Sequence, residues 1–469
     1  MWVELEPDST DARQTIAALL VNMGKLDAAR PHLEKLLASE KDSIGNAFMQ
    51  LNQLLSRNTD KAATLQLIQR LSQPYKDVPE VHFAISQAAW FANQHPLAAE
   101  EMQRALALRP GWEIAAVHNG RILQRASSAD ASEFYQDYLK KYPAANEVRI
   151  AYARLLIADN HADLAREQLQ WLLEKNPEDA EITLAIGLLA TEMGDFDTTE
   201  KSFNKALSLG YKDTNAVHFY LGQIYEETKR PDMAMQSYQM VKSGGRYLPA
   251  QIRYADLLAL KGHLKEAREH LQKLPAANDQ QAAHLILAEA QILRRSKAHK
   301  EVFDLLNDGL KKLPDYPELL YDRALAADKL GKFNIVEQDL RKLIKLKPDN
   351  AHAYNALGYS LAERGAQLPE ALKLIRKAVE LSPEDPYIMD SLGWVYYRMG
   401  NFVEGLNYLN LAFAARPDPE IAAHLGEVLW AKGAKDDAKD IWRYALEKDP
   451  DNDILLETLQ RLLKKKAID

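Results

Sequence analysis

The side chains that most often carry out protein chemistry do not form catalytic or metal-binding patterns in this chain. It contains no cysteine, which excludes disulfides, thiol catalysis and thiolate zinc sites. None of its twelve histidines has another histidine three or four residues away, as a metal pair on one helix face requires. The chain also lacks H-E-x-x-H, G-x-S-x-G, G-x-G-x-x-G and G-x-x-x-x-G-K-[ST]. We therefore expect no catalytic residues, no metal, no cofactor and no enzymatic activity.

The residues that do recur at a fixed spacing are prolines and small residues. Successive blocks of 33 to 35 residues end at Pro314, Pro348, Pro383, Pro417 and Pro450. The last block carries Gly426 at its eighth position, Ala438 at its twentieth and Trp442 at its twenty-fourth. Small residues at the eighth and twentieth positions let two antiparallel helices approach closely, and the bulky residue at the twenty-fourth fills the remaining gap. Proline ends the second helix. This pattern resembles the tetratricopeptide repeat (TPR), a helix–turn–helix unit of 34 residues.

The same register runs through nearly the whole chain and predicts its fold. We expect an all-α, right-handed TPR superhelical solenoid of about 13 helix pairs with a C-terminal capping helix. The expected segments are 1–7, the remnant of an upstream repeat; 8–275, an N-terminal array of about eight units; 276–314, a degenerate unit or joint; 315–450, four regular units; and 451–469, the capping helix and tail.

Two features of the sequence explain these boundaries. The unit before the joint closes early at Pro275, and Val302 replaces the small residue at the twentieth position of the next one. At the front, segment 1–7 is the expected remnant of a repeat, and half a repeat on its own cannot bury its apolar face. We therefore expect the natural protein to extend upstream of Met1 by at least one repeat and any signal sequence.

Composition narrows the possible partners. The net charge of −8 and the absence of a concentrated basic patch disfavour nucleic acid. No apolar run approaches the roughly 18 residues that a membrane span requires. Proteins are the expected partners.

Candidate binding residues lie at the positions that line the concave surface of a TPR array. The resemblance assigns this role to positions two, five, nine and twelve of each first helix. In the C-terminal units the candidates for partner binding are Tyr387, Asp390, Trp394, Tyr397, Trp430, Asn355, Tyr359 and Glu427. Exposed Trp and Tyr are frequent at binding hot spots. The alternative interpretation is that a tight superhelix packs these residues against a neighbouring turn.

Other residues at defined positions have simpler interpretations. His284 and His352 take the second position of their units, so we expect polar groove residues rather than metal ligands. Tyr396 and Trp442 take positions that are normally buried. Chaperone-binding TPR domains hold a C-terminal carboxylate with Lys at the fifth position and Asn at the ninth. The pairs Asn355/Tyr359 and Asp390/Trp394 do not match, so we expect no such clamp.

Three runs in the C-terminal third are more specific than the general repeat. They are NALGYSLAER at 355–364, DSLGWVYYRMGN at 390–401 and PDPEIAAHLGEVLW at 417–430. Together they resemble a family of large proteobacterial TPR lipoproteins, anchored in the outer membrane and facing the periplasm. At least one type binds and activates a carboxyl-terminal processing protease that degrades peptidoglycan hydrolases. The resemblance implies a periplasmic adaptor for such a protease and its cell-wall hydrolase substrates. The family's lipid-bearing cysteine has no counterpart here.

The residues leave two other functions open. One is a TPR component of an exopolysaccharide or pilus assembly system. The other is the regulatory array of an enzyme whose catalytic domain lies upstream of Met1.

Overall fold

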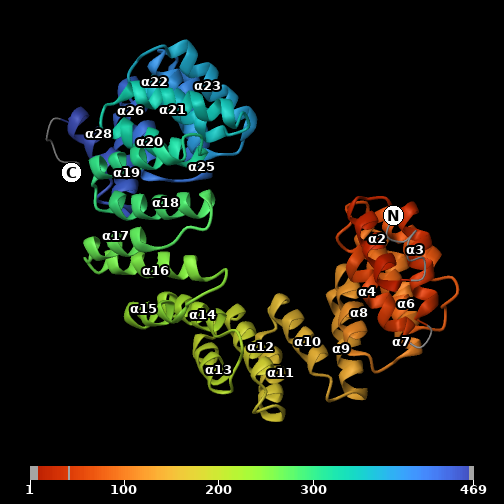
Figure 1. Cartoon of the computed structure of the whole chain (residues 1–469). Helices are drawn as coiled ribbons and strands as arrows, with labels where there is room; N and C mark the ends of the chain where they lie inside the picture. The colour runs from red at the N-terminus through yellow and green to blue at the C-terminus, as the bar shows by residue number, and fades with distance from the viewer. Residues whose placement is uncertain (1–8, 41–42, 464–469) are drawn as a thin grey trace. The chain divides into compact units, whose positions relative to one another are not determined.

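The computed structural model describes residues 9–40 and 43–463, which fold into α-helices joined by turns (Figure 1). The chain divides into two compact units, residues 1–230 and 231–469. Unit 1 contains α2 (Thr10–Asn22), α3 (Leu26–Ser39), α4 (Ile44–Leu55), α5 (Lys61–Leu71), α6 (Pro79–Phe91), α7 (His95–Leu108), α8 (Glu113–Ala126), α9 (Ser128–Lys141), α10 (Asn146–Ala158), α11 (Ala162–Lys175), α12 (Ala180–Glu192), α13 (Phe196–Ser208) and α14 (Thr214–Glu227).

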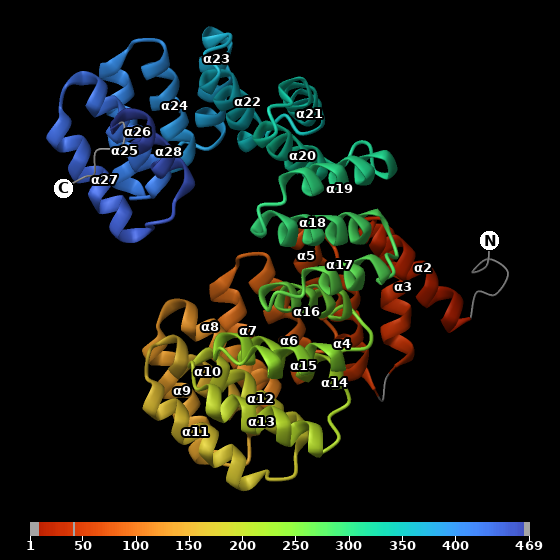
Figure 2. The ribbon, with the colours of Figure 1, turned by 90° about the vertical axis from the view of Figure 1, so that its left-hand side faces the viewer.

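Unit 2 continues the same alternation of helices (Figure 2). It contains α15 (Pro231–Met240), α16 (Tyr247–Leu260), α17 (Leu264–Lys273), α18 (Asp279–Arg295), α19 (His299–Lys312), α20 (Pro317–Lys329), α21 (Phe333–Leu346), α22 (Ala351–Glu363), α23 (Leu368–Leu381), α24 (Pro386–Arg398), α25 (Phe402–Ala415), α26 (Pro419–Lys432), α27 (Lys435–Lys448) and α28 (Asp453–Leu463).

The predicted all-α TPR solenoid is confirmed. The described residues form 27 helices and no strand, and α2/α3 through α26/α27 make thirteen consecutive pairs before the single helix α28. The unit boundary falls inside the α14/α15 pair rather than in 276–314. The proposed joint at 276–314 and the other segment limits stay predictions. The expected remnant at 1–7 and the tail after 463 lie outside the described residues.

Close packing within the pairs follows from the small residues at the eighth and twentieth positions. A Cβ atom on Gly426 would lie 2.0 Å from Trp442 Nε1, and Trp442 is fully buried as predicted. A Cβ atom on Gly393 would lie 2.9 Å from the Gly405 carbonyl oxygen. In these two pairs the helices therefore touch backbone to ring or backbone to backbone, and a methyl group cannot be inserted without displacing them.

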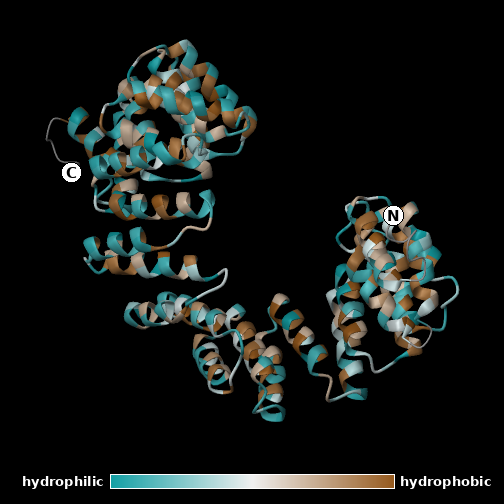
Figure 3. Cartoon of the chain, viewed as in Figure 1, coloured by the Kyte–Doolittle hydropathy of each residue, from teal (hydrophilic) through white to brown (hydrophobic). Residues whose placement is uncertain are grey.

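The helices are amphipathic, with apolar and polar residues on different sides (Figure 3). Within each unit, their apolar sides form small cores between neighbouring helices, such as the one around Trp442 and Leu455 that joins α26, α27 and α28. The final helix thus covers the apolar face of the last repeat, which is the role expected of a cap. Among the residues described, no helix combines the length and apolarity that crossing a bilayer requires.

Candidate functional site

One hollow of unit 2 lies along its consecutive first helices. It is a groove of about 700 Å³ between α16, α18, α20 and the start of α22. Its lining combines apolar and polar side chains: Ile252, His284, Leu287, Ala288, Gln291, Arg294, Pro317, Glu318, Tyr321, Asp322, Asn350 and His352. We refer to this set as the inner groove. A concave, partly apolar surface with a few polar groups is the usual form of a ligand site.

At the polar edge of the inner groove, two of the lining side chains form an ion pair with each other. Arg294 Nη2 donates to Asp322 Oδ2 at 2.7 Å, which links α18 to α20. Burial, together with the carboxylates of Asp322 and Asp385, raises the pKa of Tyr321. The neutral phenol is therefore favoured further, and its hydroxyl can both donate and accept a hydrogen bond.

A second hollow continues the groove toward the N-terminal end of α22. It has a volume of about 420 Å³ and shares Pro317, Glu318, Asn350 and His352 with the inner groove. Lys347 and Asp349 line its far side. The linings of the two hollows together carry both basic and acidic side chains.

The two histidines assigned to the groove by position do line it. His284 lies on α18 and His352 on α22, and both are exposed. Within the described ranges, no three or more His, Asp or Glu side chains are arranged to hold a metal ion. Their placement therefore supports a polar lining.

Three of the eight residues predicted for partner binding, Tyr359, Asp390 and Trp394, lie in a separate cluster built on α22, α24 and α26. His424 Nδ1 lies 2.8 Å from Asp390 Oδ2, and its Nε2 lies 3.2 Å from the Tyr359 hydroxyl. The imidazole stacks on Trp394, with ring centroids 4.4 Å apart. Trp394 Nε1 donates to Glu363 Oε2 at 2.7 Å. We call Tyr359, Asp390, Trp394 and His424 the His424 cluster.

The expectation that Trp394 lies open on the groove is wrong. Its exposed fraction is 3 %, and Asp390 is 6 % exposed. The cause is the curvature of the array: Tyr359 on α22 and His424 on α26 are 65 residues apart, yet their side chains touch across α24. The residues of α24 beneath them are covered. Of the two interpretations that the sequence left open, burial favours packing for Trp394 and Asp390.

The remaining candidates are distributed around this cluster. Glu427 is also buried. The two terminal guanidinium nitrogens of Arg461 on α28 each donate to one of the Glu427 carboxylate oxygens. Tyr387 is 40 % exposed and donates to Asp418 Oδ2 at 3.1 Å. Those that are half-buried are Asn355, Tyr359, Tyr397 and Trp430. Partner binding by Tyr387, Tyr397 and Trp430 stays a prediction.

Electrostatics inside the His424 cluster favour a charged ring. Burial alone would lower the pKa of His424, but the carboxylates of Asp390, Glu363 and Glu427 outweigh it, so that its pKa is raised. Burial and nearby carboxylates raise the pKa of Tyr359 well above its usual value. An imidazolium can then donate from Nδ1 to Asp390 and from Nε2 to the Tyr359 oxygen. Asp390 Oδ1 has no hydrogen-bond partner among the described residues.

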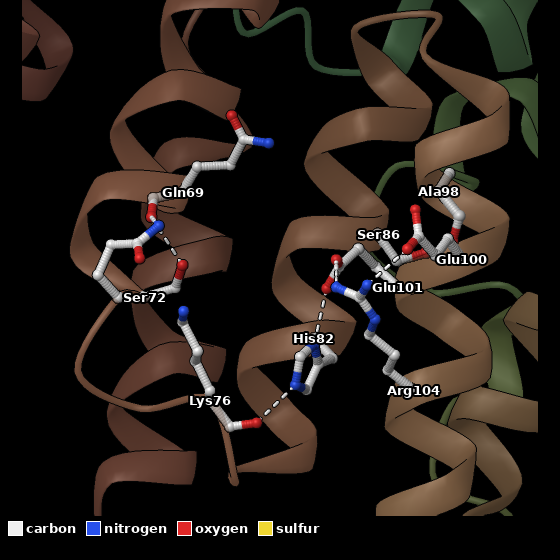
Figure 4. Close-up of polar contacts among 10 residues, drawn as sticks. Gln69, Ser72, Lys76, His82, Ser86, Ala98, Glu100, Glu101 and Arg104 are labelled. Atoms are coloured by element: carbon white, nitrogen blue, oxygen red, sulfur yellow. Dashed lines mark hydrogen bonds and ion pairs between the residues drawn. The ribbon is translucent and has the colours of Figure 1, made fainter.

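Unit 1 contains a comparable buried network (Figure 4). His82 Nδ1 lies 2.6 Å from Glu101 Oε2, and its Nε2 lies 2.7 Å from the Lys76 carbonyl oxygen. Arg104 Nη1 donates to the other Glu101 oxygen at 2.6 Å. The Ser86 hydroxyl on α6 also donates to the Ala98 carbonyl oxygen on α7. These contacts join α6 to α7, so we interpret the network as structural.

Sequence reasoning missed most of the inner groove, although a signal was present. Ile252, Leu287 and Tyr321 occupy the fifth position of three consecutive units, one of the groove positions already used for the C-terminal candidates. Asp322 and His424 occupy the sixth position, which had not been considered. The positional rule, which assigns positions two, five, nine and twelve of each first helix to the concave surface, was applied mainly to the C-terminal units. Applying it to the earlier units, and adding the sixth position, would have identified these residues.

Comparison with known proteins agrees with the repeat architecture. The tetratricopeptide repeat family model matches residues 150–210, 184–249, 321–386 and 391–453. A TPR repeat-containing protein of Pseudomonas aeruginosa is 34 % identical over 429 residues, which cover 91 % of this chain and 72 % of that protein. The chain belongs to the tetratricopeptide repeat family. Proteins of this family generally mediate protein–protein interactions and are typically non-catalytic.

Other similar proteins have lower sequence identity to this chain. The cellulose synthase operon protein C of Pseudomonas fluorescens is 23 % identical over 55 % of this chain and 21 % of its own length. Among solved structures, a TPR protein of Thermus thermophilus is 25 % identical, covers 40 % of this chain and all of its own, and has a TM-score of 0.35. Yeast Tom70 is 14 % identical over 91 % of this chain and 96 % of its own, with a TM-score of 0.41.

Proposed function

We propose that this protein is a non-catalytic adaptor of the periplasm that binds a carboxyl-terminal processing protease, its cell-wall hydrolase substrates, or both. The inner groove is the observation that carries a scaffold function. It offers a partly apolar surface on the first helices of successive repeats, α16, α18, α20 and the start of α22, with exposed polar side chains such as Gln291 and Glu318. The protease and hydrolase assignment, the outer-membrane location and the lipid anchor rest on the resemblance of the C-terminal third.

An exopolysaccharide or pilus assembly component is the second candidate. The similarity to a cellulose synthase operon protein favours it, but only over 21 % of that protein. The Pseudomonas aeruginosa relative, by contrast, is similar along most of both chains. A regulatory array for an enzyme has no comparable support.

The test measures binding of the purified protein to the purified carboxyl-terminal processing protease and, separately, to a catalytically inactive hydrolase substrate. In the groove variant His284→Glu/Gln291→Glu, two exposed lining residues become acidic without emptying the core. We expect at least one of the two affinities to fall roughly tenfold or more, about 1.4 kcal/mol.

A matched control makes the same two types of substitution outside the inner groove. His161→Glu/Gln170→Glu changes an exposed His and an exposed Gln in unit 1 and should leave both affinities unchanged. If neither protease nor hydrolase binds the unaltered protein, the adaptor proposal is wrong. Equal losses in both variants would show that net charge, rather than the groove, controls binding.

A further inference from the structure

The outer side of α25 differs from that of its neighbours. The helix FVEGLNYLNLAFAA contains a single charged residue, Glu404. Val403 is 73 % exposed and Leu411 is 51 % exposed, and Asn407 lies exposed between them. These three residues are spaced by four, so they follow one another along one face of the helix. We call Val403, Asn407, Leu411 and Ala414 the α25 face.

The equivalent surfaces on either side are charged. In α23, Lys373, Arg376 and Lys377 are exposed. In α27, Asp436, Asp437, Asp440 and Arg443 are exposed. An uncharged face with two large aliphatic side chains is therefore local to α25, and it belongs to a second helix of its repeat, whereas the inner groove is lined by first helices and the turns before them.

We propose that the α25 face is a self-association surface, through which two copies of this chain pack α25 against α25. A two-fold contact requires a patch that complements itself. A patch without charges meets this condition because it brings no like charges together. Asn407 also meets it, since its amide both donates and accepts, and it forms no side-chain hydrogen bond with the residues that the structure describes.

The same asparagine argues for a protein rather than a lipid surface. A membrane would remove water from the Asn407 amide without offering a partner, which is unfavourable. A second Asn407 restores both hydrogen bonds, in the way that a buried Asn fixes register in coiled coils. Because Val403 and Leu411 each lie four residues from Asn407, an antiparallel pair places Val403 of one copy opposite Leu411 of the other. Opposed helix dipoles favour that direction.

The contact is small. One helix face is less than the roughly 800 Å² per partner of a standard interface, so the association should be reversible and depend on concentration. Analytical ultracentrifugation of the full chain across the micromolar range should therefore show a monomer–dimer equilibrium. Val403→Glu/Leu411→Glu should abolish it, because four like charges would meet. The control Leu260→Glu changes a residue on α16 that is 65 % exposed and should leave it intact.

The absence of natural cysteines allows a second, geometric test. Asn407→Cys should form a disulfide-linked dimer under mild oxidation, and Leu260→Cys should not. Val403→Cys should cross-link to Leu411→Cys in a mixture but not to itself, because its own copy lies about 12 Å farther along the axis at 1.5 Å per residue. A wild-type protein that stays monomeric throughout, a dimer that survives Val403→Glu/Leu411→Glu, or equal loss with Leu260→Glu would each overturn the proposal. None of these results depends on whether the protease binds.

Discussion

Trp394 is held by a contact on its indole ring and by a hydrogen bond at its nitrogen. The ring stacks on His424, and Nε1 donates to Glu363. Trp394→Ala should therefore lower the free energy of unfolding by about 3–5 kcal/mol, the usual range for emptying a buried aromatic site. Tyr387→Ala, which removes a side chain that is 40 % exposed, should have a much smaller effect. Urea unfolding of both variants measures the difference. Equal small losses would return Trp394 to the list of partner-binding residues.

His424 gives stability a pH dependence whose sign follows from its raised pKa. The folded protein binds the proton more tightly than the unfolded chain, whose histidine has the ordinary value of 6.5. The contribution is therefore complete below pH 6.5 and is lost as the pH rises through the folded-state pKa. The groups that face the ring are Asp390, Glu363, Glu427 and the Tyr359 hydroxyl.

We expect the free energy of unfolding of the wild type to fall, relative to that of His424→Gln, as the pH increases above 6.5. Gln keeps a polar side chain at the site but cannot take up a proton. Urea unfolding at a series of pH values, with both proteins in the same buffers, measures this difference. A constant difference across the series would mean that His424 does not change its charge between the folded and unfolded states.

At the scale of the element, the helix pair depends on the space left by its glycines. Gly426→Ala adds helix propensity of up to about 1 kcal/mol, but its methyl group would overlap the Trp442 ring. Displacing that ring in a close-packed core is expected to cost about 1–3 kcal/mol, so the net effect should be destabilising. Thermal unfolding tests the sign. In the double variant Gly426→Ala/Trp442→Phe the loss should be smaller than the sum of the two single losses, because the smaller ring makes room.

The elements were predictable from sequence because their positions are set by local chemistry. Proline ends the second helix, and glycine at the eighth position allows the first to approach, so a period of about 34 residues defines each pair. Burial of Trp394 was not predictable in this way. It depends on how far α22 and α26 curve over α24, which follows from the packing of whole helices on one another and not from any single position.

At the scale of the molecule, the same reasoning explains which parts of the candidate site were found. The positional rule located His284 and His352 in the inner groove, and it would have located Tyr321 if applied to that unit. It also selected Asp390 and Glu427, which the curvature of the array buries. A repeat pattern therefore identifies the side of a helix correctly, while accessibility on that side varies along the array.

Removal of α28 tests how stability is distributed over the whole chain. In α28, Leu455 is fully buried on the last repeat, and Arg461 binds the carboxylate of Glu427. Truncation after Asn452 should expose the core around Trp442 and release Glu427 from its cation. In a solenoid each repeat contacts only its neighbours, so stability is a sum of local terms.

Hydrogen exchange should therefore accelerate most in α26 and α27 of the truncated protein, less in α22 to α25, and not at all in unit 1. The exposed ion pair between Lys297 and Asp453 is also lost, but a pair this exposed to solvent contributes little to stability and should not extend the effect to α18. The control Asp453→Ala removes that pair alone and should leave the exchange of α26 and α27 unchanged. If exchange accelerated equally in both units, the chain would unfold as one cooperative body, and the local description of its stability would be wrong.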